Sequence, residues 1–347
     1  MHFPTATTVL ALVFLHTPST LAQCEAPVPC QDPVLNALQS SDCQTYHAFL
    51  ARGSDSGYPG HLGSLIRLVC ETLTGNPHPD TDPDASDVSC GYENIVYPAN
   101  STYAGQEMWC LSAAKGANAG QLQMKEYAER CPQSKLILLG FSQGGSVALD
   151  VLGGGGGPAF ECVQADNPAM DPETSPGSNI VAAAIFGAVR RTANQPYTVK
   201  GGKDYNGTDP RNGTQLDGLN AFADKGLLRE WCNIGDPICA VGSSPVDVEQ
   251  HLNYFKLYDQ EAAQWLVRTA TGNETVVVSV TSSRVPTKTP TGTKTGAARA
   301  TATGRGGADG GADTQGNQVQ DKEGGAGAVA AMGYIVVGIV GMVVALL

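Results

Sequence analysis

Basic residues are scarce in this chain of 347 residues. Lys and Arg together number 21, against 33 Asp and Glu, which gives a formal net charge of −12 at pH 7. Binding to nucleic acid requires a basic patch that displaces the counterions of the phosphate backbone. We therefore do not expect this acidic chain to bind nucleic acid.

Common motifs for metal and phosphate binding are also missing. The ten cysteines include no C-x-x-C pair, and no H-E-x-x-H segment occurs, so two frequent zinc-binding patterns are absent. The glycine run at residues 153–157 is not followed by Gly-Lys-Ser or Gly-Lys-Thr, which would complete a phosphate-binding loop. We expect no metal and no cofactor, and we interpret the glycine run as a permissive turn.

Apolar segments lie near both ends of the chain. Residues 9–15 (VLALVFL) are too short to span a bilayer and precede Thr20-Leu21-Ala22, which predicts a signal peptide over residues 1–22; a buried N-terminal helix is the alternative. Residues 326–347 carry no charge and follow a polar spacer. This order predicts a glycosyl-phosphatidylinositol (GPI) attachment signal over residues 313–347, and a retained membrane span is the alternative.

Between these segments the composition divides the chain into a folded part and a stalk. Residues 276–312 are rich in Thr, Ser, Pro, Gly and Ala, which predicts a disordered, O-glycosylated stalk. All ten cysteines fall within residues 23–275, the expected catalytic domain, and a secreted chain of this kind can form up to five disulfides. Acceptor sequons for N-glycosylation begin at Asn100, Asn206, Asn212 and Asn273.

Apolar strands alternate with helical segments through this domain. The strands are expected at residues 46–50, 93–97, 135–140, 180–186 and 227–232, and the helices at residues 62–73, 108–130, 146–152 and 251–268. Such alternation is typical of an α/β fold, in which helices cover both faces of a parallel sheet.

One segment indicates nucleophilic chemistry. Residues 140–144 (GFSQG) match G-x-S-x-G, follow the apolar strand KLILL and precede a helix. In that context the turn is sharp and exposes the hydroxyl of Ser142, while the glycines avoid collisions with the strand and the helix. The pattern predicts a serine nucleophile, and an ordinary loop at a strand end is the alternative.

A serine needs a base, and that base needs an acid to orient it. Of the candidates His47, His61, His78 and His251, we favour His251, which follows a loop and opens the last predicted helix. Asp236, between Cys232 and Cys239, is the preferred acid over Asp247 and Glu249, which we interpret as solvated loop carboxylates. The order Ser142, Asp236, His251 is that of the α/β-hydrolases.

The oxyanion of the tetrahedral intermediate needs hydrogen-bond donors that are already in place. The backbone N–H of Gln143, directly after the nucleophile, is one expected donor. The second is expected from the loop after the first strand, Arg52-Gly53-Ser54; a turn or helix-cap serine is the alternative interpretation of Ser54.

These segments together resemble the fungal cutinase and acetylxylan esterase family, carbohydrate esterase family five. The matching blocks run in family order from Cys43 to Arg268 and include CQTYHAFLARGS, YPA, CP, KLILLGFSQGG, IFG, WCNIGDPIC and His251. The resemblance implies a three-layer α/β-hydrolase without a lid, built on a five-stranded parallel sheet. It also implies a catalytic triad, two oxyanion donors and two disulfides, namely Ser142-Asp236-His251, Ser54 with Gln143, and Cys43–Cys131 with Cys232–Cys239.

With the end segments described above, which lie outside the part shared with the family, we expect a secreted, surface-anchored serine esterase that acts as a monomer. SQGG and YPA resemble the acetylxylan esterases, whereas RGS resembles the cutinases, and Ala188 stands where the acetylxylan branch has an acidic residue. Because SQGG includes the nucleophile and the Ala188 departure does not touch the triad, acetylated xylan is the expected substrate. Cutin or another short-chain polyester is the alternative. A non-catalytic cell-surface glycoprotein is the alternative from another class, and a lipase is less favoured because no amphipathic lid flanks the serine.

Overall fold

The computed structural model describes residues 32–75, 88–211 and 213–278. The predicted signal peptide, the GPI signal and nearly all of the stalk lie outside these residues, as does His78. Within the described part, no helix combines the length and the apolar character that crossing a bilayer requires.

A parallel sheet forms the centre of the molecule, with the strand order β2-β1-β3-β6-β8-β7. The predicted α/β class is confirmed, but the predicted count of five strands is wrong because the sheet has six. The additional strand β7 pairs with β8 at the edge of the sheet. It has only two residues, so no periodic pattern could predict it. The strands are β1 (Tyr46–Ala51), β2 (Cys90–Asn94), β3 (Lys135–Phe141), β6 (Ile180–Phe186), β7 (Thr198–Val199) and β8 (Leu228–Trp231).

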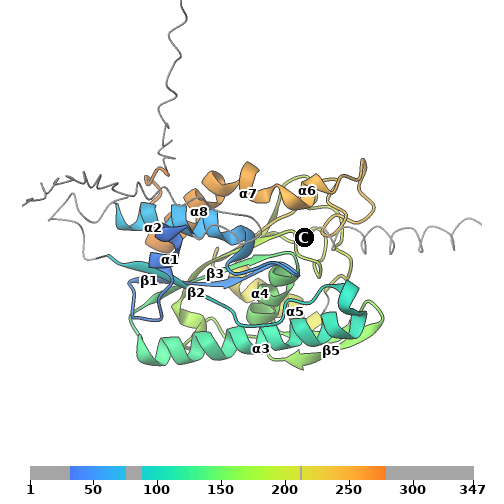
Figure 1. Ribbon diagram of the computed structural model, residues 1–347, viewed down its shortest axis with the longest axis horizontal. Coiled ribbons are helices and arrows are strands. Elements are labelled where there is room, and N and C mark those ends of the chain that lie inside the picture. The colour runs from blue at the N-terminus through green and yellow to red at the C-terminus, as the bar shows by residue number, and fades with distance from the viewer. Residues whose placement is uncertain (1–31, 76–87, 212, 279–347) are drawn as a thin grey trace, which may run out of the picture.

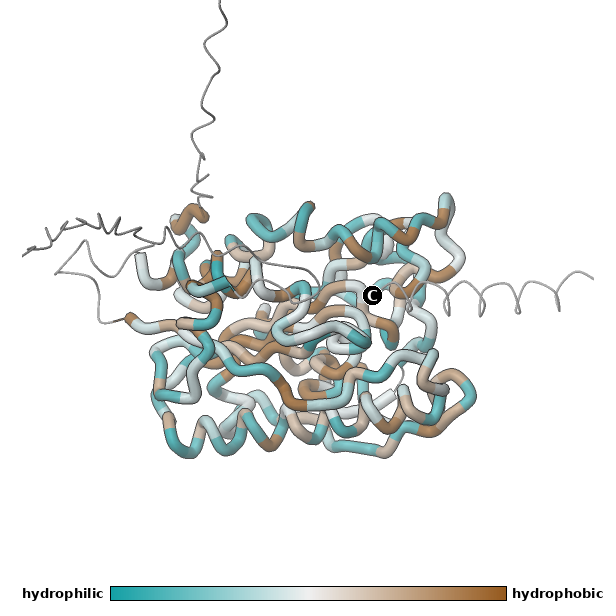
Figure 2. Tube along the Cα trace, viewed as in Figure 1, coloured by the Kyte–Doolittle hydropathy of each residue, from teal (hydrophilic) through white to brown (hydrophobic). Residues whose placement is uncertain are grey.

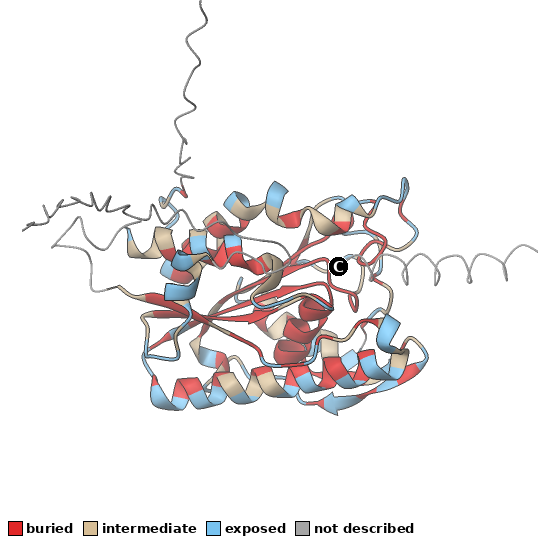
Figure 3. Ribbon diagram, in the orientation of Figure 1, coloured by how far each residue is buried: buried red, intermediate tan, exposed pale blue. Residues whose placement is uncertain are grey.

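Helices cover both faces of the sheet (Figure 1). One face packs against α1 (Pro33–Leu38), α2 (Gly63–Thr74) and α8 (Asp259–Thr271), and the other against α3 (Gln106–Arg130), α4 (Gln143–Gly153) and α5 (Gly213–Ala223). Alternate side chains of β1 enter the two cores, Phe49 on the α3 side and Leu50 on the α2 side. The central strands β1, β3 and β6 are mostly apolar in Figure 2, and they and α4 are largely buried in Figure 3.

The long helix α3 contains two glycines that allow it to approach α4 closely. A Cβ atom on Gly116 would lie 2.8 Å from Val147, and one on Gly120 would lie 2.8 Å from Val151. Glycine lowers the helix propensity of α3, but here the close packing of the two helices outweighs that cost. This contact fixes α4, the helix that begins directly after Ser142.

The sequence suggested that the glycine run at residues 153–157 is a permissive turn, but the structure shows that part of it is a strand. Its last three residues belong to β4 (Gly155–Ala159), which forms an antiparallel hairpin with β5 (Cys162–Asn167). Gly154 and Gly156 have φ of +82° and +106°, and a Cβ on Gly156 would overlap Asp166. The glycines are therefore needed for an irregular strand and not only for chain reversal.

Two further elements differ from the sequence prediction. The predicted helix over residues 251–268 is divided into α6 (Glu249–Leu252), α7 (Tyr254–Leu257) and α8, and the backbone leaves helical geometry at Asn253 and Tyr258. Strand β2 lies three residues earlier than predicted, since its pairing register with β1 begins at Cys90 opposite Tyr46. The remaining described helices are single 3₁₀ turns: η1 (Gly60–Leu62), η2 (Thr102–Ala104) and η3 (Gly177–Asn179).

Four disulfides link the described elements, and no described cysteine is free. They include the two pairs that the family resemblance implied. The other two join α2 to β2 and α3 to β5, so the hairpin is covalently attached to the long helix. The pairs are Cys43–Cys131, Cys232–Cys239, Cys70–Cys90 and Cys110–Cys162.

Candidate active site

Ser142 occupies a sharp turn between β3 and α4. Its φ of +56° is rare for a residue with a side chain and costs on the order of 1–3 kcal/mol. The flanking glycines are required, since a Cβ on Gly140 would lie 2.5 Å from Gly144 O and one on Gly144 would lie 2.0 Å from Ala51 O. The turn thus presents the serine hydroxyl at the carboxyl edge of the sheet.

Ser142, His251 and Asp236 form a continuous hydrogen-bonded chain. His251 Nε2 lies 3.0 Å from Ser142 Oγ, although 109 residues separate the two, and His251 Nδ1 lies 2.9 Å from Asp236 Oδ2. All three side chains are buried, and Ser142 is only 4 % exposed. In this arrangement an ionised Asp236 accepts the Nδ1–H and leaves the Nε2 lone pair directed at the serine.

The ionised form of Asp236 is favoured despite its burial. Desolvation alone would raise the pKa of the carboxyl, but the charge of His251 and the hydrogen bonds from His251, Tyr254 and the backbone N–H of Ile238 outweigh it and lower the pKa. The carboxylate therefore stays charged at neutral pH. A charged carboxylate can orient the imidazole and stabilise the imidazolium that forms when His251 takes a proton.

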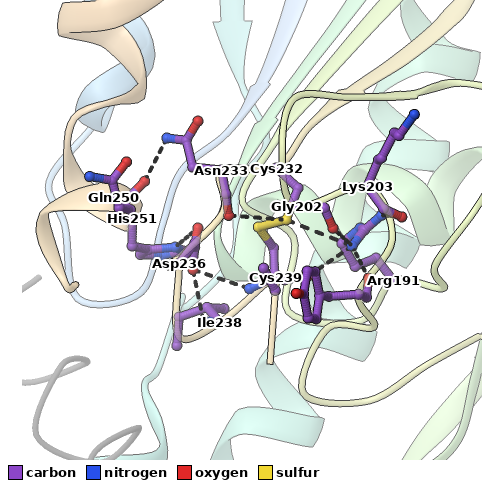
Figure 4. The surroundings of a disulfide bond; sticks show 12 residues. Arg191, Gly202, Lys203, Cys232, Asn233, Asp236, Ile238, Cys239, Gln250 and His251 are labelled. Atoms are coloured by element: carbon purple, nitrogen blue, oxygen red, sulfur yellow. Dashed lines mark hydrogen bonds and ion pairs between the residues drawn. A yellow bond between two sulfur atoms is a disulfide. The ribbon is translucent and has the colours of Figure 1, made fainter. Parts of the chain in front are cut away.

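The loop that carries Asp236 is closed by the Cys232–Cys239 disulfide (Figure 4). Asp236 Oδ1 accepts hydrogen bonds from the backbone N–H groups of Ile238 at 2.7 Å and Cys239 at 3.1 Å. The buried guanidinium of Arg191 donates to Cys239 O at 2.8 Å and forms an ion pair with Glu230. These contacts fix the carboxylate on a rigid loop beside His251.

The two expected oxyanion donors lie beside the serine. Gln143 is the first residue of α4, so its backbone N–H has no partner within the helix. Ser54 is buried, and a Cβ on its neighbour Gly53 would lie 3.5 Å from Ser142 Cβ, which places this loop against the nucleophile. The structure therefore brings Ser54 and Gln143 to the same edge of the sheet as Ser142.

The Gln143 side chain is held by a closed ring of hydrogen bonds. Its Nε2 donates to Asn100 O at 2.8 Å and its Oε1 accepts from Ser112 Oγ at 3.1 Å, while Asn100 N–H donates to Ser112 Oγ at 3.0 Å. With the side chain engaged in this way, Gln143 offers only its backbone N–H to a ligand. No sequence pattern points to Ser112, because its partners Asn100 and Gln143 are 12 and 31 residues away in the sequence.

Comparison with known proteins agrees with this geometry. A sequence profile of the cutinase family matches residues 42–270. The chain belongs to the cutinase family. This cutinase-family chain is 29 % identical over 229 residues to the acetylxylan esterase of Hypocrea jecorina and 27 % identical over 230 residues to Cutinase 11 of Verticillium dahliae. The matches cover 65 % of this chain and 67 % and 68 % of those relatives.

A comparison with solved structures also finds a similar fold in a member of the cutinase family. The catalytic core domain of acetyl xylan esterase from Trichoderma reesei is 27 % identical, with a TM-score of 0.52, over 65 % of this chain and 98 % of that one. Family membership and these relatives establish that the chain is a carboxylic ester hydrolase.

The other histidines of this cutinase-family chain contact residues other than Ser142 or lie outside the described residues. His47 is fully buried in β1, with Nε2 3.2 Å from the Glu93 carboxylate, and burial lowers its pKa. The His61 ring packs on Phe141, at 4.9 Å between centroids. His78 lies outside the described part of the chain.

The competing acids lie at the surface. Asp247 and Glu249 are both exposed, and the Asp247 carboxylate accepts from the backbone N–H of Glu249 and the side chain of Gln250. Neither contact reaches His251. Among the described residues, moreover, no group of three or more His, Cys, Asp or Glu side chains could hold a metal ion.

Proposed function

We propose that this esterase removes acetyl groups from acetylated xylan and that Ser142, His251 and Asp236 are its catalytic triad. The observation that carries the proposal is the hydrogen-bonded chain from Ser142 Oγ through His251 to Asp236. The low exposure of Ser142 favours a small acyl group such as acetyl. Two relatives named acetylxylan esterase, at 29 % and 28 % identity, support the same substrate class.

The proposed reaction has two halves. Ser142 Oγ attacks the ester carbonyl while His251 Nε2 takes the serine proton, and Ser54 with the Gln143 N–H stabilises the oxyanion. The intermediate then collapses, and His251 returns the proton to the departing sugar hydroxyl. A water molecule, deprotonated by His251, attacks the acetyl-serine, and the second tetrahedral intermediate releases acetic acid as His251 returns the proton to Ser142 Oγ. The enzyme returns to its initial protonation state.

The acyl-chain dependence of hydrolysis tests the substrate proposal. We expect kcat/KM to fall about tenfold or more from p-nitrophenyl acetate to the butyrate and longer esters, because a narrow site rejects added methylenes. We also expect acetate release from acetylated xylan, measured against a Ser142→Ala control. Faster turnover of long-chain esters without acetate release would show instead that the enzyme is a cutinase.

The cutinase alternative has its own structural support. Ile234 and Val246, on the loop segments that flank Asp236 and His251, are 47 % and 56 % exposed. Such side chains could contact an apolar polyester, and Cutinase 11 is a relative at 27 % identity. A non-catalytic glycoprotein is less favoured because it would not need an ordered triad, and failure of a fluorophosphonate probe to label Ser142 would support it.

We further propose that the enzyme is secreted and held at the cell surface by a GPI anchor. The order of segments in the sequence supports this location: an apolar leader at residues 1–22, the catalytic domain, a stalk and an apolar tail at residues 326–347. Phospholipase C specific for phosphatidylinositol is expected to release esterase activity from intact cells. Activity that stays with the membrane after this treatment would favour the retained span.

A further inference from the structure

Tyr254 lies directly behind the proposed catalytic acid. It is the first residue of α7, three residues after His251, and is fully buried. Its hydroxyl lies 2.7 Å from Asp236 Oδ2, the same oxygen that faces His251, and 2.9 Å from the backbone nitrogen of Asn233. It also lies 3.2 Å from Cys239 Sγ.

The direction of these hydrogen bonds follows from the groups involved. The backbone N–H of Asn233 can only donate, so the Tyr254 oxygen accepts there. Its single proton then goes to Asp236, because the competing sulfur of Cys239 is in a disulfide and is a weak acceptor. Burial and the charge of Asp236 raise the pKa of Tyr254 well above its usual value, so the phenol remains a donor over the working pH range.

Asp236 consequently accepts four hydrogen bonds. Two backbone N–H groups donate to Oδ1, while His251 and Tyr254 donate to Oδ2. Each donor disperses negative charge from the carboxylate. The hydrogen bond from Tyr254 to Oδ2 therefore weakens the electrostatic attraction between Asp236 and a protonated His251.

We propose that Tyr254 is a positioning residue that tunes how strongly Asp236 holds the protonated form of His251. The proposal rests on the triad assigned above and adds a fourth member to it. Tyr254 limits the stabilisation of the imidazolium, so that His251 remains free to act as a base at lower pH. It also fixes the Asp236 rotamer against the disulfide-closed loop.

Two other titratable groups lie near the triad, and their ring contacts and hydrogen bonds are with residues other than Tyr254. His61, from η1, packs on Phe141, which in turn lies 5.1 Å from the His251 ring between centroids. Arg191 approaches from the loop after β6 and is paired with Glu230. Both groups are retained when Tyr254 is changed, so they cannot account for a difference between the variant and the parent protein.

The test compares Tyr254→Phe with Tyr258→Phe. In Tyr254→Phe we expect the acid limb of the kcat/KM profile for p-nitrophenyl acetate to move up by about 0.5–1 pH unit. The Tyr258 hydroxyl donates to the side chain of Asn233 on the same loop but does not contact Asp236, so Tyr258→Phe should leave that limb in place. A purely structural role for Tyr254 would lower kcat and Tm without moving the limb, and that result overturns the proposal.

A second variant covers the case in which phenylalanine disturbs folding by leaving the Asn233 N–H without an acceptor. Replacing Tyr254 by 3-fluorotyrosine retains both hydrogen bonds but makes the phenol a stronger donor. The limb should then move in the opposite direction, to lower pH. The absence of a shift overturns the proposal.

An NMR titration of the His251 ring gives a readout that does not depend on turnover. Its midpoint should move up in Tyr254→Phe and down in the 3-fluorotyrosine variant, even if the protein hydrolyses no ester at all. Inactivity of the parent protein would thus reject the proposed function alone, whereas unmoved midpoints in both Tyr254 variants would reject the role of Tyr254 alone.

Discussion

Replacing Ser142 by alanine is expected to lower kcat for p-nitrophenyl acetate by roughly 10⁶-fold, the size of loss that removal of the nucleophile causes in other serine hydrolases. The hydroxyl is the only group in the turn whose loss prevents formation of the acyl-enzyme. Alanine keeps the Cβ atom and can take the same backbone, so Tm should change little. The measurement is kcat from initial rates together with a thermal melt by circular dichroism.

The triad should behave as one unit under this change. The double variant Ser142→Ala/His251→Ala is expected to be no slower than Ser142→Ala alone, because His251 has no proton to take once the hydroxyl is absent. Ser146→Ala, one turn further along α4, is the matched control: its Oγ accepts from the backbone N–H of Arg190, so it should lower Tm and leave kcat near the parent value. Ser142→Ala activity above about 1 % of the parent would contradict the assignment.

The sheet was predictable where strands are buried on both faces. β6 is a continuous apolar run, β3 is one after Lys135, and β1 is apolar except for His47, so composition alone marks them. β2 was misplaced because the apolar residues at 95–97 continue past the strand, and only pairing with β1 sets its limits. The β4–β5 hairpin had no alternating pattern, since glycines make up most of its first strand.

Some residues of the candidate site could likewise be predicted from the sequence, and others could not. Ser142 lies in a local motif whose geometry depends on neighbours in the sequence, and Asp236 lies in a loop marked by two cysteines. Tyr254 and Ser112 gave no signal, because each acts through partners from another part of the chain. In a continuous helix, a tyrosine three residues after His251 would be expected to pack in the core. In the structure the helix is interrupted at Asn253, and the Tyr254 hydroxyl contacts Asp236.

Replacing Asp236 by asparagine should reduce kcat/KM at neutral pH by about 10⁴-fold, although the side chain keeps its shape. The reason is the set of donors around the carboxylate. The oxygen that faces Ile238 and Cys239 receives two backbone N–H groups, which can only donate. The asparagine carbonyl must occupy that position, and its NH₂ then faces His251 Nδ1. This arrangement places the imidazole proton on Nε2, where it faces Ser142 and cannot serve as a base.

Stability should report the same change through its dependence on pH. The pKa of Asp236 is lower in the folded protein than its ordinary value of 3.8. The ionised carboxylate therefore stabilises the fold above about pH 4, and this contribution is lost as the pH falls through the folded pKa. The Tm difference between the parent and Asp236→Asn should be largest near neutral pH and should shrink in acid.

The exposed acid Asp247 provides the matched control for this prediction. Asp247→Asn removes a carboxylate from the same loop region, but its contacts are with Glu249 and Gln250. Its kcat/KM should stay within about twofold of the parent, since solvent screens the lost charge. If Asp236→Asn kept activity within tenfold while Asp247→Asn lost it, Asp247 would be the acid that orients His251. Nitrogen-15 NMR of His251 in Asp236→Asn would then show the proton still on Nδ1, because the tautomer depends on which group accepts from that nitrogen.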